Sequence, residues 1–120
     1  MIKEIAFVGI PITDMKRARG FYEGVLGLNP TTTEEDAKWV EYEVGNATLG
    51  IADYGERWKP GTGGGTMAAF ETDDLEGLMD RVKASGATVA MDLMESPVCR
   101  FGIVLDPDGN AVMLHKRKSA

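Results

Sequence analysis

The segment TDMKRARGFYEGVLGL, residues 13–28, decides the interpretation of the first half of the chain. Thr13-Asp14 provides side chains of the type that cap a helix N-terminus. Apolar residues then recur at helical spacing, and Gly27 is the residue type that ends a helix. The segment therefore predicts an amphipathic helix. Its apolar positions are Met15, Ala18, Phe21, Tyr22 and Val25.

Strand patterns surround this helix. Ile5–Ile12 is apolar and predicts a strand before it, and Thr31–Thr33 suggests a short strand after it. Trp39–Val44 and Ala47–Ala52 alternate between apolar and other residues on either side of Gly45-Asn46, which is typical of a two-residue hairpin turn. This turn would pair Val44 with Ala47 and Glu41 with Gly50.

The same order of elements returns after a Pro- and Gly-rich linker. Phe7–Asp14 and Met67–Asp74 match at an offset of 60 residues, which indicates an internal duplication. We expect one domain over residues 1–120, with module 1 at about 4–53, a linker at 54–65 and module 2 at about 66–117. The elements predicted in module 2 are a strand at Thr66–Thr72, a helix capped by Asp73-Asp74 and ended by Gly86, and strands near Ala87–Leu93, Cys99–Leu105 and Ala111–Lys116.

Residues 13–28, together with Asp106-Pro107-Asp108-Gly109-Asn110 in the last predicted turn, resemble the signatures of the vicinal oxygen chelate superfamily. This superfamily includes glyoxalase I, bleomycin-resistance proteins and extradiol dioxygenases. The resemblance implies an α+β fold of two tandem βαβββ modules. Each module would form a curved mixed sheet with its helix on the convex side and a ligand cavity on the concave side.

The resemblance also implies where a metal would bind. Metal-using members carry His, Gln or Glu at four positions, which correspond here to Phe7, Gly50, Met67 and Met113. None of these residues is a plausible ligand for a hard or borderline divalent ion. We therefore predict no metal and no other cofactor, and we reject glyoxalase I and extradiol dioxygenase activity, because both need the metal.

The remaining residues on the predicted cavity face describe a small-molecule pocket. The hairpin pairing places Trp39 and Glu41 on the face of Gly50, which leaves room beside Glu41. Glu41 and His115 are the candidate polar groups, and they are also the weak candidates for catalysis. Phe101, Ile103 and Leu105 would share a face with Met113. The predicted apolar walls are Phe7, Trp39, Met67, Phe101, Ile103 and Met113.

Each of these residues has a purely structural alternative. Met67 and Met113 can pack against each other or against a dimer mate, and Trp39 can belong to a subunit interface. Glu41 can be a solvated carboxylate on the sheet, and His115 an ordinary half-exposed histidine. No Ser or Cys stands at a spacing that supports a catalytic triad with His115. Cys99 lies beside Arg100, but we expect a buried, inert thiol.

Composition excludes several classes of function. The chain has 120 residues with one Cys and one His, so it forms no intrachain disulfide and cannot supply a two-His metal site alone. Its net charge of −6 argues against nucleic-acid binding. The apolar run Ile5–Ile12 is too short for a membrane span. We expect a cytoplasmic protein without nucleic-acid or membrane partners.

These observations favour a metal-free protein that binds or sequesters a small molecule, in the manner of the bleomycin-resistance branch. The ligand would be largely apolar or aromatic, with a cationic group as an option, and the protein a homodimer. An alternative is a glyoxalase- or dioxygenase-like lyase, isomerase or oxygenase. It would use metal ligands at other positions, or acid–base catalysis by Glu41 and His115. A third is a regulatory or interaction module without a ligand.

Overall fold

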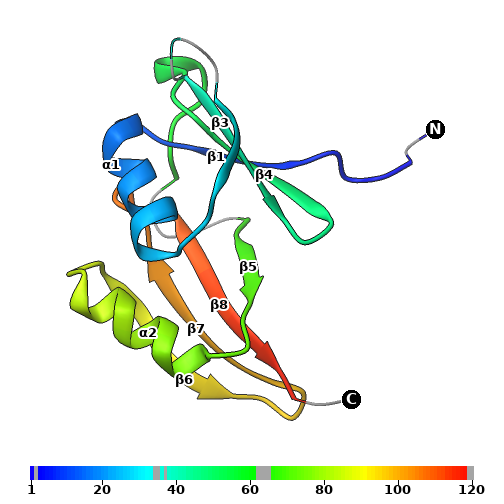
Figure 1. The fold of residues 1–120 in the computed structure, drawn as a ribbon, viewed down its shortest axis with the longest axis vertical. Coiled ribbons are helices and arrows are strands. Elements are labelled where there is room, and N and C mark those ends of the chain that lie inside the picture. Colours follow the sequence, from blue (N-terminus) through cyan, green and yellow to red (C-terminus); the bar gives the residue numbers. More distant parts are fainter. Residues whose placement is uncertain (2, 34–35, 37, 62–65, 119–120) are drawn as a thin grey trace. The chain divides into compact units, whose positions relative to one another are not determined.

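Two units follow one another along the chain in a computed structural model that describes residues 1, 3–33, 36, 38–61 and 66–118. The first is Met1–Pro60 and the second Gly61–Ala120, and each is built on a four-stranded sheet (Figure 1). The division falls inside the predicted linker. Of the linker glycines, Gly63, Gly64 and Gly65 lie outside the described residues.

The sheet of the first unit has the order β1-β4-β3-β2. β1 runs parallel to β4, and the other neighbours are antiparallel. β1 is shorter than the predicted strand Ile5–Ile12, because only Leu49–Ala52 of β4 pair with it. The other strands agree closely with the prediction. Their bounds are Val8–Pro11 for β1, Pro30–Thr33 for β2, Trp39–Val44 for β3 and Ala47–Ala52 for β4.

The predicted helix of the first unit is divided in two. Its first part is the α-helix α1 (Met15–Arg19), where Asp14 Oδ1 accepts the Arg17 N–H at 3.1 Å as an N-cap. It continues as a π-helix, η1 (Gly20–Val25), and Gly27 ends it at a φ of +77°. The predicted apolar side is buried through Ala18, Phe21 and Tyr22. A short 3-10 helix, η2 (Gly55–Arg57), lies within the predicted linker.

The second unit repeats the topology of the first, which confirms the predicted duplication. Its sheet has the order β5-β8-β7-β6, again with one parallel pair, β5 with β8. Asp74 caps its helix by accepting the Gly77 N–H at 3.0 Å, and Gly86 follows the helix at a φ of +82°. The elements are β5 (Ala68–Glu71), α2 (Leu75–Ala84), β6 (Val89–Glu95), β7 (Cys99–Leu105) and β8 (Ala111–Arg117).

The strand registers align the two units residue by residue. Gly9 of β1 pairs with Gly50 of β4, and Ala69 of β5 pairs with Met113 of β8. Gly9 and Ala69 stand 60 residues apart, like Phe7 and Met67, so they are equivalent positions of the two units. Their partners in the neighbouring strands, Gly50 and Met113, are therefore equivalent as well. That Gly50 and Met113 both stand at metal-ligand positions of the superfamily stays a prediction.

Each sheet buries one face against its own helix. In the second unit α2 lies along β7 and β8 (Figure 1). A Cβ atom at Gly102 would stand 2.7 Å from Cε of Met79, so this glycine permits the close approach. In the first unit the rings of Tyr22 and Tyr42 lie 6.4 Å apart between η1 and β3. The buried strand residues on the helix side are Ile10, Val40, Tyr42, Leu49 and Ile51 in the first unit and Val104, Val112 and Leu114 in the second; Ala52 and Cys99 are buried on the opposite faces.

The turn before β8 is held by a buried carboxylate. Asp106 is 4% exposed and accepts the backbone N–H groups of Asp108 at 2.9 Å and Asn110 at 2.8 Å. The side-chain amide of Asn110 donates to it at 2.8 Å. Gly109 adopts a φ of +85°, which explains the glycine in the turn. Among the described helices, none is long and apolar enough to cross a membrane.

Candidate functional site

The face of the first sheet that lies opposite its helix carries the candidates predicted in module 1. Trp39 and Glu41 alternate along β3 with the buried Val40 and Tyr42. Glu41 pairs with Gly50, as predicted from the hairpin turn. The predicted facing of β3 and β4 is therefore confirmed.

Two tryptophans lie over two paired glycines on this face. A Cβ atom at Gly50 would collide with the six-membered ring of Trp39 and stand 3.1 Å from its Cε2. A Cβ atom at Gly9 would collide with Cη2 of Trp58 and stand 3.2 Å from its Cζ2. Since Gly9 and Gly50 pair across β1 and β4, the tips of both indoles lie over neighbouring backbone positions. The room that Gly50 was predicted to leave beside Glu41 is thus filled by Trp39.

Trp39 is fixed at its edge and at its ring. Its Nε1–H donates to Oε2 of Glu41 at 2.8 Å. The ring of Phe7 meets it edge to face, with centroids 5.2 Å apart and an interplanar angle of 80°. We call Phe7, Trp39 and Trp58 the aromatic platform. Phe7 is 49% exposed and Trp58 36%, so the platform presents aromatic area within its own unit.

Trp58 is missing from the candidates named from the sequence. It follows η2, in the stretch interpreted as a linker. The available signal was Gly9, because a glycine inside a strand often marks the close approach of another group.

The corresponding face of the second sheet carries the candidates of module 2. Phe101 pairs with His115 and Ile103 with Met113, so these four side chains and Leu105 share one face, as predicted. All of them are half-buried. Met67 stands just before β5 and is 36% exposed. The structure thus assembles Phe7, Trp39, Glu41 and Gly50 in the first unit, and Phe101, Ile103, Met113 and His115 in the second.

His115 has a partner that the sequence analysis did not name. Its Nδ1 lies 2.6 Å from Oε1 of Glu71, which is its register partner on β5. Oε2 of Glu71 accepts the backbone N–H of Arg117 at 2.7 Å. The bond from Arg117 and then the bond from His115 hold the pKa of the Glu71 carboxyl below its usual value. Glu71 is therefore a carboxylate at neutral pH.

The residues at the four positions where the resemblance implies metal ligands do not fit a divalent ion. Phe7 and Gly50 offer no donor atom, and Met67 and Met113 offer only thioethers, which suit copper(I) rather than zinc, nickel or iron(II). Among the described residues, no three His, Cys, Asp or Glu side chains come together in a way that could hold a metal ion. The chemistry of these side chains therefore disagrees with the metal site of the metal-using enzymes.

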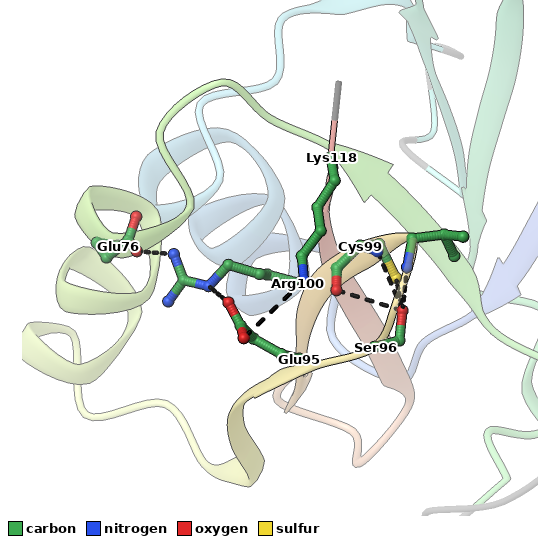
Figure 2. Close-up of polar contacts among 7 residues, drawn as sticks. Glu76, Glu95, Ser96, Cys99, Arg100 and Lys118 are labelled. Atoms are coloured by element: carbon green, nitrogen blue, oxygen red, sulfur yellow. Dashed lines mark hydrogen bonds and ion pairs between the residues drawn. The ribbon is translucent and has the colours of Figure 1, made fainter. Parts of the chain in front are cut away.

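A polar cluster in the second unit ties β7 to its surroundings (Figure 2). The guanidinium of Arg100 contacts Glu76 of α2 and lies 3.6 Å from Glu95 at the end of β6. Ser96 Oγ accepts the Cys99 N–H at 3.0 Å and lies 3.1 Å from Cys99 Sγ. Cys99 is 9% exposed, so the expected buried thiol is confirmed. The cluster serves the fold, because Arg100 alternates with Phe101 and lies on the helix side.

A second polar cluster anchors the helix of the first unit. The buried Tyr42 donates its hydroxyl to Oε2 of Glu23 at 2.8 Å, and Arg19 Nε donates to the same oxygen at 2.6 Å. Burial raises the pKa of the Glu23 carboxyl, but the hydrogen bonds from Arg19 and Tyr42 outweigh this and lower it. Burial and the neighbouring Glu23 raise the pKa of the Tyr42 hydroxyl.

The sequence matches the family model of the Glyoxalase/Bleomycin resistance protein/Dioxygenase superfamily over residues 4–114. The chain therefore belongs to this superfamily. No curated protein matches the sequence significantly.

Solved structures share the fold at low sequence identity. One is TnmS3, an antibiotic binding protein from Streptomyces sp. CB03234, with 23% identity, 98% of each chain covered and a TM-score of 0.78. Another is lactoylglutathione lyase from Agrobacterium tumefaciens, with 21% identity, 97% of this chain and 95% of that chain covered, and a TM-score of 0.73. Fosfomycin resistance protein FosX from Mesorhizobium loti has 19% identity, coverage of 97% and 93%, and a TM-score of 0.74. These likenesses define the fold, which hosts several activities.

Proposed function

We propose that this chain is a metal-free small-molecule-binding protein of the resistance type, which sequesters a largely aromatic ligand. The observation that carries the proposal is the aromatic platform, which lies over Gly50, one of the positions where the resemblance implies a metal ligand. Trp39 occupies that position, so the face offers aromatic rings instead of a coordination site. The antibiotic-binding description of TnmS3 and the resistance description of FosX support a role of this kind.

The chemistry of the platform favours a planar ligand. Exposed aromatic rings stack on planar partners and attract cations through their faces. Glu41 adds a carboxylate at the edge of Trp39. The Glu41 carboxylate accepts a hydrogen bond from the Trp39 indole, and its negative charge increases the electron density of that ring. We therefore propose a planar aromatic ligand, with a positive charge as the preferred variant.

A ligand screen followed by matched variants tests the platform. A thermal-shift screen that includes planar aromatics and cationic antibiotics should find compounds that raise the melting temperature. Trp58→Ala and Trp39→Ala should each weaken binding of such a compound by about 1–3 kcal/mol, the scale of an aromatic contact at a binding hot spot. Unchanged affinity in both variants would show that the ligand does not bind to this face of the sheet.

The charge of Glu41 is tested against a neighbour on the same strand. Glu41→Gln should weaken a cationic ligand in a salt-dependent way and change a neutral one little. Glu43 stands two residues away on the same face of β3, where it accepts from Thr48 at 3.0 Å. Glu43→Gln removes the same formal charge, so it is the matched control. Equal losses in both variants would indicate the net charge of the protein rather than a contact with Glu41.

The absence of a metal requires its own measurement. Elemental analysis of the purified protein should show no stoichiometric zinc, nickel, manganese or iron, and divalent ions should leave the melting temperature unchanged. A stoichiometric metal that raises the melting temperature would overturn the proposal and favour an enzyme with ligands at other positions.

We also propose that the protein is a homodimer of single-domain chains. Each sheet has two edge strands, β1 and β2 in the first unit and β5 and β6 in the second, and sheet edges invite pairing or cover. Light scattering at micromolar concentration should give the mass of a dimer. The mass of a monomer would contradict this expectation. Loss of the dimer in Trp39→Ala would assign Trp39 to the interface.

A further inference from the structure

We propose that His115 and Glu71 form a second binding site in this chain, a proton-accepting pair on the second sheet that recognises the hydroxyl group of a phenolic ligand. The inference rests on the proposed small-molecule binding and adds a ligand class to it. It uses residues of the second unit only, so it is tested independently of the aromatic platform.

The pair is built by the parallel register of β5 and β8. Glu71 and His115 are direct partners in this register and point to the same face, opposite α2. β5 ends at Glu71, so the Arg117 N–H has no strand partner there, and Oε2 of Glu71 accepts it instead. Oε1 is thereby aimed at His115. The Arg117 N–H thus orients the Glu71 carboxylate, and the carboxylate orients the His115 imidazole.

This arrangement determines which ring nitrogen is available. An anionic carboxylate only accepts hydrogen bonds, so Nδ1 of His115 must carry the hydrogen of the 2.6 Å contact. In the neutral imidazole Nε2 then has a free lone pair. Among the described residues, Nε2 has no hydrogen-bond partner. The side chain of His115 is 23% exposed, so part of the imidazole reaches the surface.

The neighbours of the pair favour an aromatic hydroxyl over a sugar or a polyol. Phe101 is the register partner of His115 on β7, and Met113 stands two residues earlier on the same face of β8. Met94 of β6 pairs with Phe101 and is 50% exposed. An apolar ring that carries one polar hydroxyl matches an apolar surface that carries one acceptor.

The charged and titratable groups around His115 are few. Glu71 faces it from β5, and Cys99 of β7 pairs with Arg117 further along the same face. The exposed Arg117 follows His115 on this face of β8, and Lys116 lies on the other face, where its Nζ donates to the Asp73 carbonyl at 2.9 Å. Glu71 is thus the single carboxylate in contact with the imidazole among the described residues.

The chemical step is a proton transfer. The O–H bond of the phenol breaks, an N–H bond forms at Nε2 of His115, and the electron pair stays on the phenolate oxygen. Glu71 remains a carboxylate and stabilises the imidazolium, which in turn attracts the phenolate. The proton returns to the phenolate when the ligand leaves, so no other reactant is needed.

The chain contains one histidine, which makes the site directly observable by NMR. Nitrogen-15 spectra of the neutral imidazole should show a hydrogen on Nδ1 and a bare Nε2. The Glu71→Gln variant should shift the population toward the other tautomer, in which Nε2 carries the hydrogen. A wild-type imidazole with its hydrogen on Nε2 would overturn the proposal.

4-Nitrophenol is the probe for binding, because its ionised form absorbs visible light. It should shift the Nε2 resonance saturably and should be bound as the phenolate. 4-Nitroanisole has a methyl group in place of the proton, and it should bind at least tenfold more weakly. Glu71→Gln should weaken the binding of 4-nitrophenol by about tenfold. His115→Gln should abolish the increase in phenolate absorbance that the wild-type protein causes at a fixed pH. Glu76→Gln removes a carboxylate on the helix side of the same sheet, and it should leave the response unchanged.

The outcomes separate this inference from the proposed function. An Nε2 resonance that does not respond to 4-nitrophenol, or equal binding of 4-nitroanisole, would overturn the phenol site. If His115→Gln then still binds the compounds from the thermal-shift screen, the proposed function stands. The opposite result is that the Nε2 resonance responds to 4-nitrophenol as expected, while the platform variants bind the compounds from the screen as tightly as the wild type. That result would support the phenol site and contradict the proposed role of the aromatic platform.

Discussion

Substituting Gly50 by alanine tests whether the contact between this glycine and Trp39 shapes the face of the first sheet. The new Cβ atom would collide with the ring of Trp39. Carbon atoms in contact stand about 3.5–4.0 Å apart, so the indole must retreat by about 1 Å. Trp39 is a side chain on a sheet surface and can move, so the variant should fold.

The energetic effect follows from the contacts that hold the indole. Displacement weakens the hydrogen bond from Trp39 to Glu41, at about 1 kcal/mol for a half-exposed pair. It also disturbs the edge-to-face contact with Phe7, at about 0.5–1 kcal/mol. Replacing a strand glycine by alanine returns about 0.5 kcal/mol. We expect Gly50→Ala to lower the free energy of unfolding by about 1–1.5 kcal/mol, and the melting temperature by about 4–6 °C.

A double-mutant cycle assigns this loss to Trp39. Urea unfolding, followed by far-ultraviolet circular dichroism, gives the free energy of each variant. In a Trp39→Ala background, Gly50→Ala should be neutral or slightly stabilising. Gly24→Ala is the control, because a Cβ atom there meets nothing within 4 Å. An equal loss from Gly50→Ala in both backgrounds would refute the reasoning, since the effect would then come from the backbone.

Three further substitutions test other parts of the fold. A Cβ atom at Gly77 would collide with the carboxylate of Asp74, so Gly77→Ala should give no gain in thermal stability, whereas in an Asp74→Ala background it should gain about 1 kcal/mol of helix propensity. Tyr42→Phe should lower the free energy of unfolding by about 1–2 kcal/mol through the lost bond to Glu23. Because the pKa of Glu23 is lowered in the folded state, its contribution is present above the unfolded carboxyl pKa of about 4.3 and is lost as the pH falls through the folded value. Urea midpoints between pH 3 and 7 should therefore show a weaker acid dependence in Tyr42→Phe than in the wild type. Asp106→Ala should cost about 2–4 kcal/mol in chemical denaturation, because it leaves the N–H groups of Asp108 and Asn110 without their acceptor; a change below 0.5 kcal/mol would contradict the role of the turn.

Local signals made much of the fold predictable. The two-residue turn at Gly45-Asn46 fixed the register of β3 and β4, and with it the facing of Trp39 and Glu41. Asp14 and Asp74 marked the helix starts because capping uses atoms three residues apart. The length of β1 was overestimated, because hydrophobicity does not show how far along a neighbouring strand the pairing extends.

The contacts that distinguish the candidate site join distant parts of the sequence. Trp58 meets Gly9, and Glu71 meets His115, across 49 and 44 residues. The second contact depends on the parallel register of β5 and β8, which no turn length determines. The π-helical form of η1 was also missed, because its residues satisfy the spacing of an ordinary helix.

The close approach of the Trp39 indole to Gly50 has a consequence for the evolution of the duplicated halves. The registers make Gly50 the counterpart of Met113, and Trp39 the counterpart of Phe101. In the second unit the space at this position is filled by the side chain of Met113. In the first unit the residue is Gly50, and the indole of Trp39 fills the space. The two positions are therefore coupled: a larger residue at position 50 should cost less stability in a chain where Trp39 has already become smaller. A metal-ligating side chain at position 50 would therefore be acquired at the lowest cost in stability by two mutations, with Trp39 changing first.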